Sequence, residues 1–190
     1  MPAEPSSPAQ YRARSVRSEE APRLVAIINA AAEAYRGKIP ADCWHEPYMP
    51  AAALQAELHA GVAFSGIDID GELVAIMGVR AARNVSMIRH AYVLPSHQGS
   101  GLGGQLIEQI CSTLDRQIFV GTWRAATWAI GFYERHSFNL VPASSISTLL
   151  RTFWTIPDRQ IETSVVLARP ALDEEAIGAL VAESVRHPPD

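Results

Sequence analysis

The chain has few cysteines and no long apolar run. Its two cysteines, Cys43 and Cys111, form no CxxC pair and have no metal-ligand spacing, so we expect no metal site and a reduced, cytoplasmic protein. No apolar stretch approaches the roughly 20 residues needed to cross a bilayer, so no membrane partner is expected. The segment from Met1 to Pro8 has no basic flank and no apolar core, which argues against a signal peptide.

The chain also has few charged residues, and neither sign of charge strongly exceeds the other. Charged residues make up 19% of the 190 residues, and the formal net charge is −4. Proteins that bind nucleic acids usually carry a basic field, so this balance argues against a nucleic-acid partner. Hydrophobic residues make up 48% of the chain, which suits one domain that buries about 70% of its unfolded surface.

The domain limits follow from composition and periodicity. Residues 1–9 are rich in Pro, Ser and Ala and are predicted to form a disordered tail. Residues 10–170 contain no repeat and no linker, so we predict a single domain there. In residues 171–190 apolar side chains recur at helical spacing, and this helix is expected to pack on the domain or on a second subunit, which leaves a homodimer open.

One stretch organises the rest of the chain. A β-prone run, Ser86–Leu94, is stopped by Pro95, which has no N–H to continue a strand ladder. A glycine-rich turn, Gln98–Gly104, follows it. Beyond the turn, an apolar stripe at helical spacing predicts a helix that reaches Leu114.

The glycine-rich turn is a poor start for an ordinary helix, because each Gly costs about 1 kcal/mol relative to Ala. Without Cβ atoms, however, a phosphate can approach the partly positive N–H groups at a helix N-terminus. We therefore interpret the turn as a cradle for a pyrophosphate. A flexible connection between strand and helix is the alternative.

The remaining elements have local signals of their own. Asp70-Gly71 predicts a hairpin between strands at 62–69 and 72–80, and the apolar run 73–77 predicts a strand buried on both faces. Further strands are expected at 11–17, 85–94, 117–123, 138–141 and 160–168, and helices at 18–32, 51–60, 127–136 and 144–153.

The segment 35–50 is irregular, because three prolines interrupt it. It holds Tyr35, Trp44, His45 and Glu46, a set of side chains typical of a binding loop. Aromatic side chains that cover one end of the core would give the same composition. Both interpretations stay open.

The turn also contains G-x-G-x-x-G at 99–104, the dinucleotide fingerprint, which is weak by itself. That fingerprint places its first Gly at the end of the first strand of a βαβ unit and an acidic residue at the end of the next strand. Here the strand ends several residues earlier, near Leu94, and a hairpin precedes it. The next strand closes with 120–122, which offers no carboxylate, so the sequence argues against a dinucleotide-binding fold.

Two motifs carry a family resemblance. The run 98–103, Q-G-S-G-L-G, resembles the Q/R-x-x-G-x-G/A signature of the GCN5-related N-acetyltransferases, the GNAT superfamily. The run 129–138, A-I-G-F-Y-E-R-H-S-F, is similar to the second hallmark of that family, A-x-x-F-Y-x-x-x-G-F. The motifs stand in the family's order, and the resemblance spans roughly residues 11–168. Two positions depart from it, since Ala126 replaces a frequent Asn and Ser137 replaces a Gly.

The resemblance implies an α/β fold with a mixed, mostly antiparallel sheet of six to seven strands and helices on both faces. It implies acetyl-CoA as the co-substrate, with its pyrophosphate on the backbone N–H groups of the turn. In the family, the strand before the turn splays from its neighbour at a bulge, and its edge pairs with the pantetheine amides. The cofactor-binding residues that it implies are Tyr92, Val93, Gln98, Gly99, Ser100, Gly101, Leu102, Gly103 and Gly104.

Tyr133 matches the family position that often protonates the leaving thiolate. A phenol with a pKa near 10 suits that role of general acid. A Tyr that is only packed under its helix is the alternative.

The general base is less clear. Family members often have Glu or His where this chain has Arg89, and a guanidinium cannot act as a base at neutral pH. Arg89 would instead hold a carboxylate of the acceptor or pair with an acidic neighbour. His90 is the adjacent candidate base, but strand alternation turns it to the opposite face, where a buried, hydrogen-bonded role fits as well. Glu46, His45 and water are further candidates.

These inferences predict an N-acetyltransferase that moves an acetyl group from acetyl-CoA directly to a primary amine of a small molecule. Candidate substrate-binding residues are Arg89, Tyr35 and Trp44, and an acceptor held by Arg89 would be carboxylated and amino-acid-like. Peptide or protein N-termini and lysines are alternative acceptors, because the 35–50 segment would also suit the border of a peptide groove. A CoA-binding sensor without catalysis is a rival from another class.

Overall fold

The computed structural model describes residues 10–186, so the predicted tail at 1–9 and the last residues, 187–190, lie outside it. Within the described range, seven strands form one sheet in the order β1-β2-β3-β4-β5-β7-β6. They are β1 (Arg14–Ser15), β2 (Ala63–Ile69), β3 (Glu72–Ala82), β4 (Val85–Val93), β5 (Gln117–Trp123), β6 (Asn139–Leu140) and β7 (Ser164–Arg169). Only β4 and β5 run parallel, which confirms a mixed, mostly antiparallel sheet.

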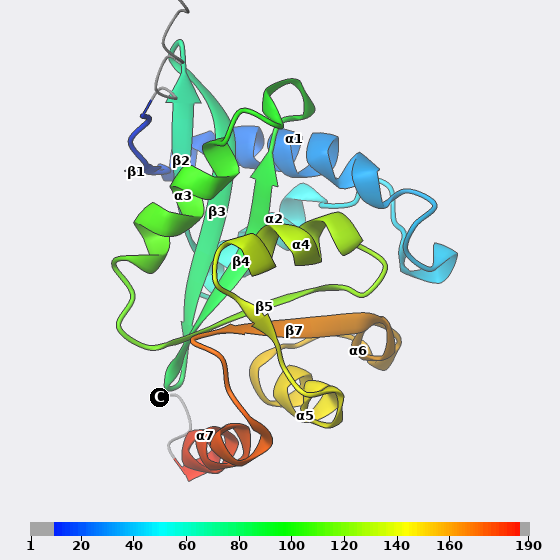
Figure 1. Ribbon diagram of the computed structural model, residues 1–190. Helices are drawn as coiled ribbons and strands as arrows, with labels where there is room; N and C mark the ends of the chain where they lie inside the picture. Colours follow the sequence, from blue (N-terminus) through cyan, green and yellow to red (C-terminus); the bar gives the residue numbers. More distant parts are fainter. Residues whose placement is uncertain (1–9, 187–190) are drawn as a thin grey trace, which may run out of the picture.

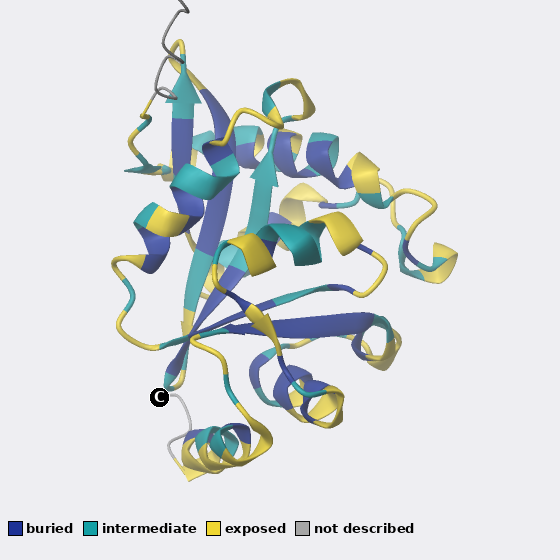
Figure 2. Cartoon of the chain, in the orientation of Figure 1, coloured by how far each residue is buried: buried dark blue, intermediate teal, exposed yellow. Residues whose placement is uncertain are grey.

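Helices cover both faces of the sheet (Figure 1). They are α1 (Ala21–Ala32), α2 (Ala51–His59), α3 (Leu102–Cys111), α4 (Thr127–Arg135), α5 (Ala143–Phe153), α6 (Asp158–Thr163) and α7 (Glu174–Arg186). On one face α1 and α2 enclose a core of their own with Phe64 and Ile76. α3 and α4 pack on the other face, and α7 packs on α5. Figure 2 shows the buried residues running along β3 and β7, at the centre of the molecule.

The last strand is shorter than the sequence predicts. Residues 160–168 alternate in polarity, but α6 occupies their first part and β7 begins only at Ser164. Pro157 stands at the N-cap position of α6, Asp158 lies in its first turn, and Ile161 is buried beneath it. Packing of this one side chain therefore outweighs the alternating pattern. The first strand is also shorter than the predicted 11–17.

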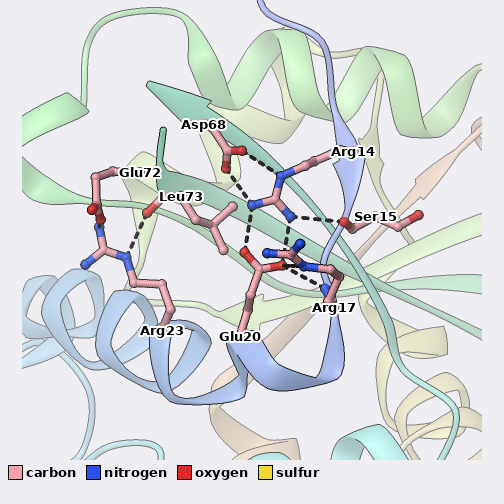
Figure 3. Close-up of polar contacts among 8 residues, drawn as sticks. All are labelled: Arg14, Ser15, Arg17, Glu20, Arg23, Asp68, Glu72 and Leu73. Carbon is pink, nitrogen blue, oxygen red and sulfur yellow. Dashed lines mark hydrogen bonds and ion pairs between the residues drawn. The ribbon is translucent and has the colours of Figure 1, made fainter. Parts of the chain in front are cut away.

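An arginine anchors the short first strand to its surroundings (Figure 3). The guanidinium of Arg14 binds both carboxylate oxygens of Asp68 on β2, at 2.6 and 2.8 Å. It also binds both oxygens of Glu20, at 2.7 and 2.9 Å, in the turn that enters α1. Because Arg14 holds both partners in bidentate geometry, it fixes β1, β2 and the start of α1 to one another.

β4 carries a bulge in its second half. Gly78 of β3 pairs with Arg89, and Ile76 pairs with Tyr92, so the single residue between them on β3 faces two residues on β4. One of those two, His90, has a φ of +51°. A bulge of this kind bends its strand and increases the local twist.

β4 and β5 stop pairing just before the bulge. Their parallel pairing spans only Val85–Ile88 on β4 and Gln117–Val120 on β5. From there β4 continues with β3 alone and β5 continues with β7 alone. The splay that the family resemblance implies is therefore present, and it opens the middle of the sheet at one end.

Candidate active site

The glycine-rich turn leaves backbone N–H groups without helical acceptors. Gly99 and Gly101 have φ values of +79° and +82°, a region that Gly enters without strain, and a Cβ on either would meet open space. The N–H of Gln105 binds the carbonyl of Gly101 at 3.0 Å. The amides of residues 102–104, in the first turn of α3, precede that bond and have no acceptor within the helix. Together with the helix dipole they favour an anion at this point.

Two side chains hold the turn in shape. Nε2 of Gln98 donates to the carbonyl oxygen of Val93, at 3.1 Å, and so ties the turn to the end of β4. The hydroxyl of Ser100 donates to the carbonyl of His97. Both bonds fix the path of the chain between the strand and α3.

The rest of the motif lies between α3 and α4. Leu102 is buried in the main core. A Cβ on Gly103 would lie 3.3 Å from the ring of Phe132, and a Cβ on Gly104 would lie 3.0 Å from the ring of His136. The two helices therefore approach each other here at a distance that suits glycine.

Two cavities adjoin in the splay. The larger cavity, of about 530 Å³, lies between the glycine-rich turn, the end of β4, α1 and α4. The smaller cavity, of about 130 Å³, lies between the diverging strands β4 and β5 and the side chains of α5 and α6. Tyr35, Ala91, Tyr92 and Tyr133 line both. The two cavities therefore share a wall that is formed by these four residues.

Tyrosines dominate the junction of the two cavities. Burial raises the pKa of Tyr35 to about 12, and it raises the pKa values of Tyr48, Tyr92 and Tyr133 above the usual value for a phenol. These phenols are therefore protonated throughout the neutral range. Tyr92 is hydrogen-bonded to Tyr48 and Tyr35, so its proton is shared within the cluster of tyrosines.

α4 brings Tyr133 to this junction. Its ring packs edge-on against Phe132 and Phe138, with centroid distances of 5.2 and 5.7 Å, and 7% of the residue is exposed. The aromatic contacts fix the direction of the side chain, while its place in both cavity walls puts it beside any ligand that spans them. Burial keeps its proton in place, although a phenol with a raised pKa is a weaker acid than a free one.

Arg89 and His90 contact the same carboxylate. Nη2 of Arg89 donates to Oε1 of Glu57 at 2.7 Å, and Nε2 of His90 lies 3.3 Å from Oε2 of Glu57. The prediction that strand alternation separates Arg89 from His90 is wrong, because the bulge and the positive φ of His90 break the alternation. Both residues contribute to the wall of the smaller cavity. Of the two roles open for Arg89, pairing with an acidic neighbour is the one observed.

Glu57 was not among the site residues predicted from the sequence. Burial opposes its ionisation, but the close contact with His90 and the charge of Arg89 outweigh burial and lower its pKa. Its position on α2 held a signal, since Glu57 falls between the inward-facing Leu54 and Leu58 at helical spacing. A carboxylate on the inner face of a helix needs a partner, and the bulge supplies two.

The two aromatic candidates of the 35–50 segment have different surroundings. Tyr35 stacks with Tyr48 and lies 5.7 Å from the ring of Trp128, and it lines both cavities. Trp44 lines neither of them. It packs on Tyr48, with centroids 5.5 Å apart, and under the guanidinium of Arg36 at 4.6 Å. Tyr35 can therefore contact a ligand in either cavity. Trp44 lies outside both cavities and packs on Tyr48.

The described part of the chain holds no candidate metal cluster and no candidate membrane-spanning helix. Within residues 10–186, no three His, Cys, Asp or Glu side chains gather closely enough to hold a metal ion. The helices in this range include none whose length and apolar character would let it cross a membrane.

Comparison with known proteins identifies solved structures of similar fold and a matching family model. Similar solved structures include the PaiA N-acetyltransferase from Thermoplasma acidophilum in complex with coenzyme A (TM-score 0.62, 15% identity, 84% of this chain and 98% of that chain). They also include the ribosomal-protein-S18-alanine N-acetyltransferase from Escherichia coli (TM-score 0.59, 15% identity, 83% of this chain and 92% of that chain). No curated protein matches the chain in sequence. The model of the acetyltransferase (GNAT) family matches residues 24–138, more than half of the chain, and the protein therefore belongs to the GNAT acetyltransferase family.

Proposed function

We propose that the protein transfers the acetyl group of acetyl-CoA directly to a primary amine of a small molecule. The observation that carries this proposal is the pair of adjoining cavities in the splay, which share Tyr35, Ala91, Tyr92 and Tyr133. One cavity would hold the acetylated end of the donor and the other the amine. The thioester and the nucleophile would then meet at the shared wall.

The donor side is supported by the backbone of the turn. Amides of residues 99–104 would take the diphosphate of acetyl-CoA, since the glycines leave its approach open. The larger cavity then offers about 530 Å³ for the pantetheine arm beside the free edge of β4. The PaiA N-acetyltransferase from Thermoplasma, which has a similar fold, forms a complex with coenzyme A, and this supports a coenzyme A thioester as the donor.

The chemistry needs one proton removed and one supplied. The amine nitrogen attacks the thioester carbon, a C–N bond forms, the C–S bond breaks, and the thiolate departs. Tyr133, which faces both cavities, would give its proton to that thiolate. His90, in the wall of the smaller cavity, would take the proton of the amine.

The other candidates for the base have less support. Glu46 is exposed and forms an ion pair with Arg36 at 2.9 Å, and His45 is exposed as well. Neither of them lines the two cavities. Arg89 is neutralised by Glu57, so an acceptor carboxylate would have to displace an existing ion pair to reach it.

The acceptor side favours a small molecule. The smaller cavity offers about 130 Å³, and Leu150, Trp154 and Gln160 of the α5–α6 region contribute to its wall. An amine with a few neighbouring atoms fits such a space. A peptide N-terminus would need an open path for the following residues as well.

Release of free thiol from acetyl-CoA tests the proposal. The purified protein would be assayed with amino acids, polyamines, aminoglycosides and peptides with free N-termini. We expect saturable release with one class of small amines and a product heavier by one acetyl group. Activity confined to peptides would replace the acceptor class, and tight coenzyme A binding without release against any amine would indicate a sensor.

A further inference from the structure

The contact between Glu57 and His90 carries an inference that rests on the proposed function. We propose that Glu57 is a positioning residue that selects one tautomer of His90. Its carboxylate would accept a hydrogen bond from an N–H at Nε2 of the imidazole, which leaves the lone pair of Nδ1 to receive the proton of the acceptor amine. The family motifs do not include Glu57, because it lies on α2, about thirty residues before the strand that it serves.

Two buried atoms define the tautomer. Nε2 of His90 and Oε2 of Glu57 are both buried, and among residues 10–186 neither has a well-aligned hydrogen-bond partner. They lie 3.3 Å from each other. A buried acceptor without a donor costs about 1–3 kcal/mol, and a small rotation that turns a proton on Nε2 toward Oε2 would satisfy both atoms at once. A neutral imidazole carries one N–H, and its other nitrogen is then an acceptor.

The carboxylate is held so that it cannot turn away. Its other oxygen, Oε1, accepts from Nη2 of Arg89 at 2.7 Å. The side chains of Arg89 and His90 are each 13% exposed, and that of Glu57 is 23% exposed. The imidazole also stacks on Phe64, with ring centroids 6.0 Å apart. The ring and the carboxylate therefore have one mutual arrangement.

The bulge makes this arrangement possible. In a regular strand, Arg89 and His90 would point to opposite faces. The φ of +51° at His90 brings both side chains to Glu57 and keeps both in the wall of the smaller cavity. A backbone conformation that costs free energy persists where the surroundings demand it, and such positions concentrate at functional sites.

Charge around the ring supports the same role. Glu57 on α2 contacts His90, Arg89 on β4 is its neighbour in the chain, and the charge of Arg80 on β3 acts on both members of the ion pair between Arg89 and Glu57. When Nδ1 takes a proton, the ring becomes a cation, and Glu57 is the anion that offsets it.

Glu57→Gln separates a tautomer effect from a loss of packing, because it keeps the shape of the side chain. Its single carbonyl oxygen would pair with the charged Arg89, so its NH₂ group would face Nε2 of His90. A donor at that place favours the opposite tautomer, with the proton on Nδ1. Substitutions that reverse the tautomer of a catalytic histidine cost up to about 10⁴-fold in kcat.

The first measurement needs no substrate. Nitrogen-15 NMR of the full chain at alkaline pH reports which imidazole nitrogen carries the proton, with His90→Gln used to assign the signal. We expect the proton on Nε2 in the natural protein and a shift toward Nδ1 in Glu57→Gln. A proton on Nδ1 in the natural protein, or the same tautomer in both, overturns the proposal.

The second measurement is kcat and kcat/KM against pH for Glu57→Gln, Glu57→Asp and Glu72→Gln. We expect a loss of about 100-fold or more in kcat for Glu57→Gln with the KM for acetyl-CoA unchanged, and a changed pH profile of kcat. Glu57→Asp should recover part of the activity. Glu72, which forms an exposed ion pair with Arg23 at 3.4 Å, provides the control that retains full activity.

Two outcomes distinguish failure of the inference from failure of the proposed function. If Glu57→Gln lowers only the urea midpoint and leaves kcat and the pH profile of the folded protein unchanged, Glu57 is structural and the inference fails. If the natural protein acetylates no amine, the proposed function fails, and the NMR result still decides whether Glu57 sets the tautomer.

Discussion

Tyr133 gives the most direct prediction at the scale of one residue. Tyr133→Phe keeps the aromatic packing against Phe132 and Phe138 and removes the only proton that the side chain can give. We expect kcat to fall by about 100-fold or more with the KM for acetyl-CoA unchanged, since loss of a general acid typically costs 10²–10⁴-fold. Steady-state thiol release measures both constants. Tyr11→Phe, outside the two cavities, is the matched control, and an equal kcat in both variants would reduce Tyr133 to a packing residue.

Ser137 holds a position that glycine would occupy at lower cost. Its φ is +64°, just after the end of α4, where the N–H of Phe138 binds the carbonyl of Tyr133 at 3.1 Å. A side chain in the left-handed region costs about 1–2 kcal/mol, so Ser137→Gly should raise the free energy of unfolding by about 1 kcal/mol. Urea denaturation measures the change. Ser112→Gly, at a φ of −66°, should bring no gain, and a gain at Ser112 with none at Ser137 would contradict the argument.

At the scale of the helices and strands, the sequence predicted those elements that are determined by a pattern of neighbouring residues. The Asp70-Gly71 turn, the apolar run of β3 and the glycine-rich entry to α3 each have a signal within a few residues, and the structure has an element at each place. α6 escaped prediction because six residues around one buried Ile161 have no period of their own. Such a helix depends on packing that the sequence does not display.

For the candidate site, too, the sequence predicted the parts that have a local motif and not the contacts between distant segments. The family motifs indicated the turn and Tyr133, but they did not indicate the partner of Arg89 and His90. An extra residue in β4 leaves no mark in the pattern of apolar residues, so alternation placed His90 on the wrong face. Glu57 is distant in sequence, and the bulge is what brings the two segments together.

The bulge gives a prediction about β3. A Cβ on Gly78 would lie 2.7 Å from Cγ1 of Val62 and 3.0 Å from the carbonyl oxygen of Arg89. Gly78→Ala should therefore lower the free energy of unfolding by about 1–3 kcal/mol, and it should lower kcat as β4 shifts. Gly178→Ala, in α7 with open space around it, should instead gain about 1 kcal/mol. Thermal and urea unfolding compare them, and equal effects of the two changes would be inconsistent with a tight bulge.

The anchor of the first strand gives a prediction about acid stability. Hydrogen bonds from Arg14 lower the pKa of Glu20 from its ordinary 4.5 to about 2. A carboxylate with a lowered pKa stabilises the fold above its ordinary value, and that contribution is lost as the pH falls from about 4.5 toward 2. In Glu20→Gln the free energy of unfolding should decline less steeply over this window. Urea unfolding at a series of pH values measures the slope, and an unchanged slope would place the acid sensitivity elsewhere.

At the scale of the whole molecule, the donor should stabilise the fold. A ligand that binds only the folded state at 100 times its Kd adds about 2.7 kcal/mol to the free energy of unfolding. We expect acetyl-CoA and coenzyme A to raise the melting temperature in a concentration-dependent way, because their diphosphate and pantetheine parts span the turn and the splay. Thermal denaturation with NAD is the control. A rise with NAD and none with coenzyme A would support the dinucleotide interpretation of the glycines instead.

A crystal structure of the protein with bound coenzyme A tests the central claim most directly. The account predicts the diphosphate on the main-chain amides of residues 99–104, the pantetheine arm along the free edge of β4, and the sulfur beside Tyr133. Coenzyme A bound elsewhere, with the turn vacant and the splay filled by side chains, would contradict it.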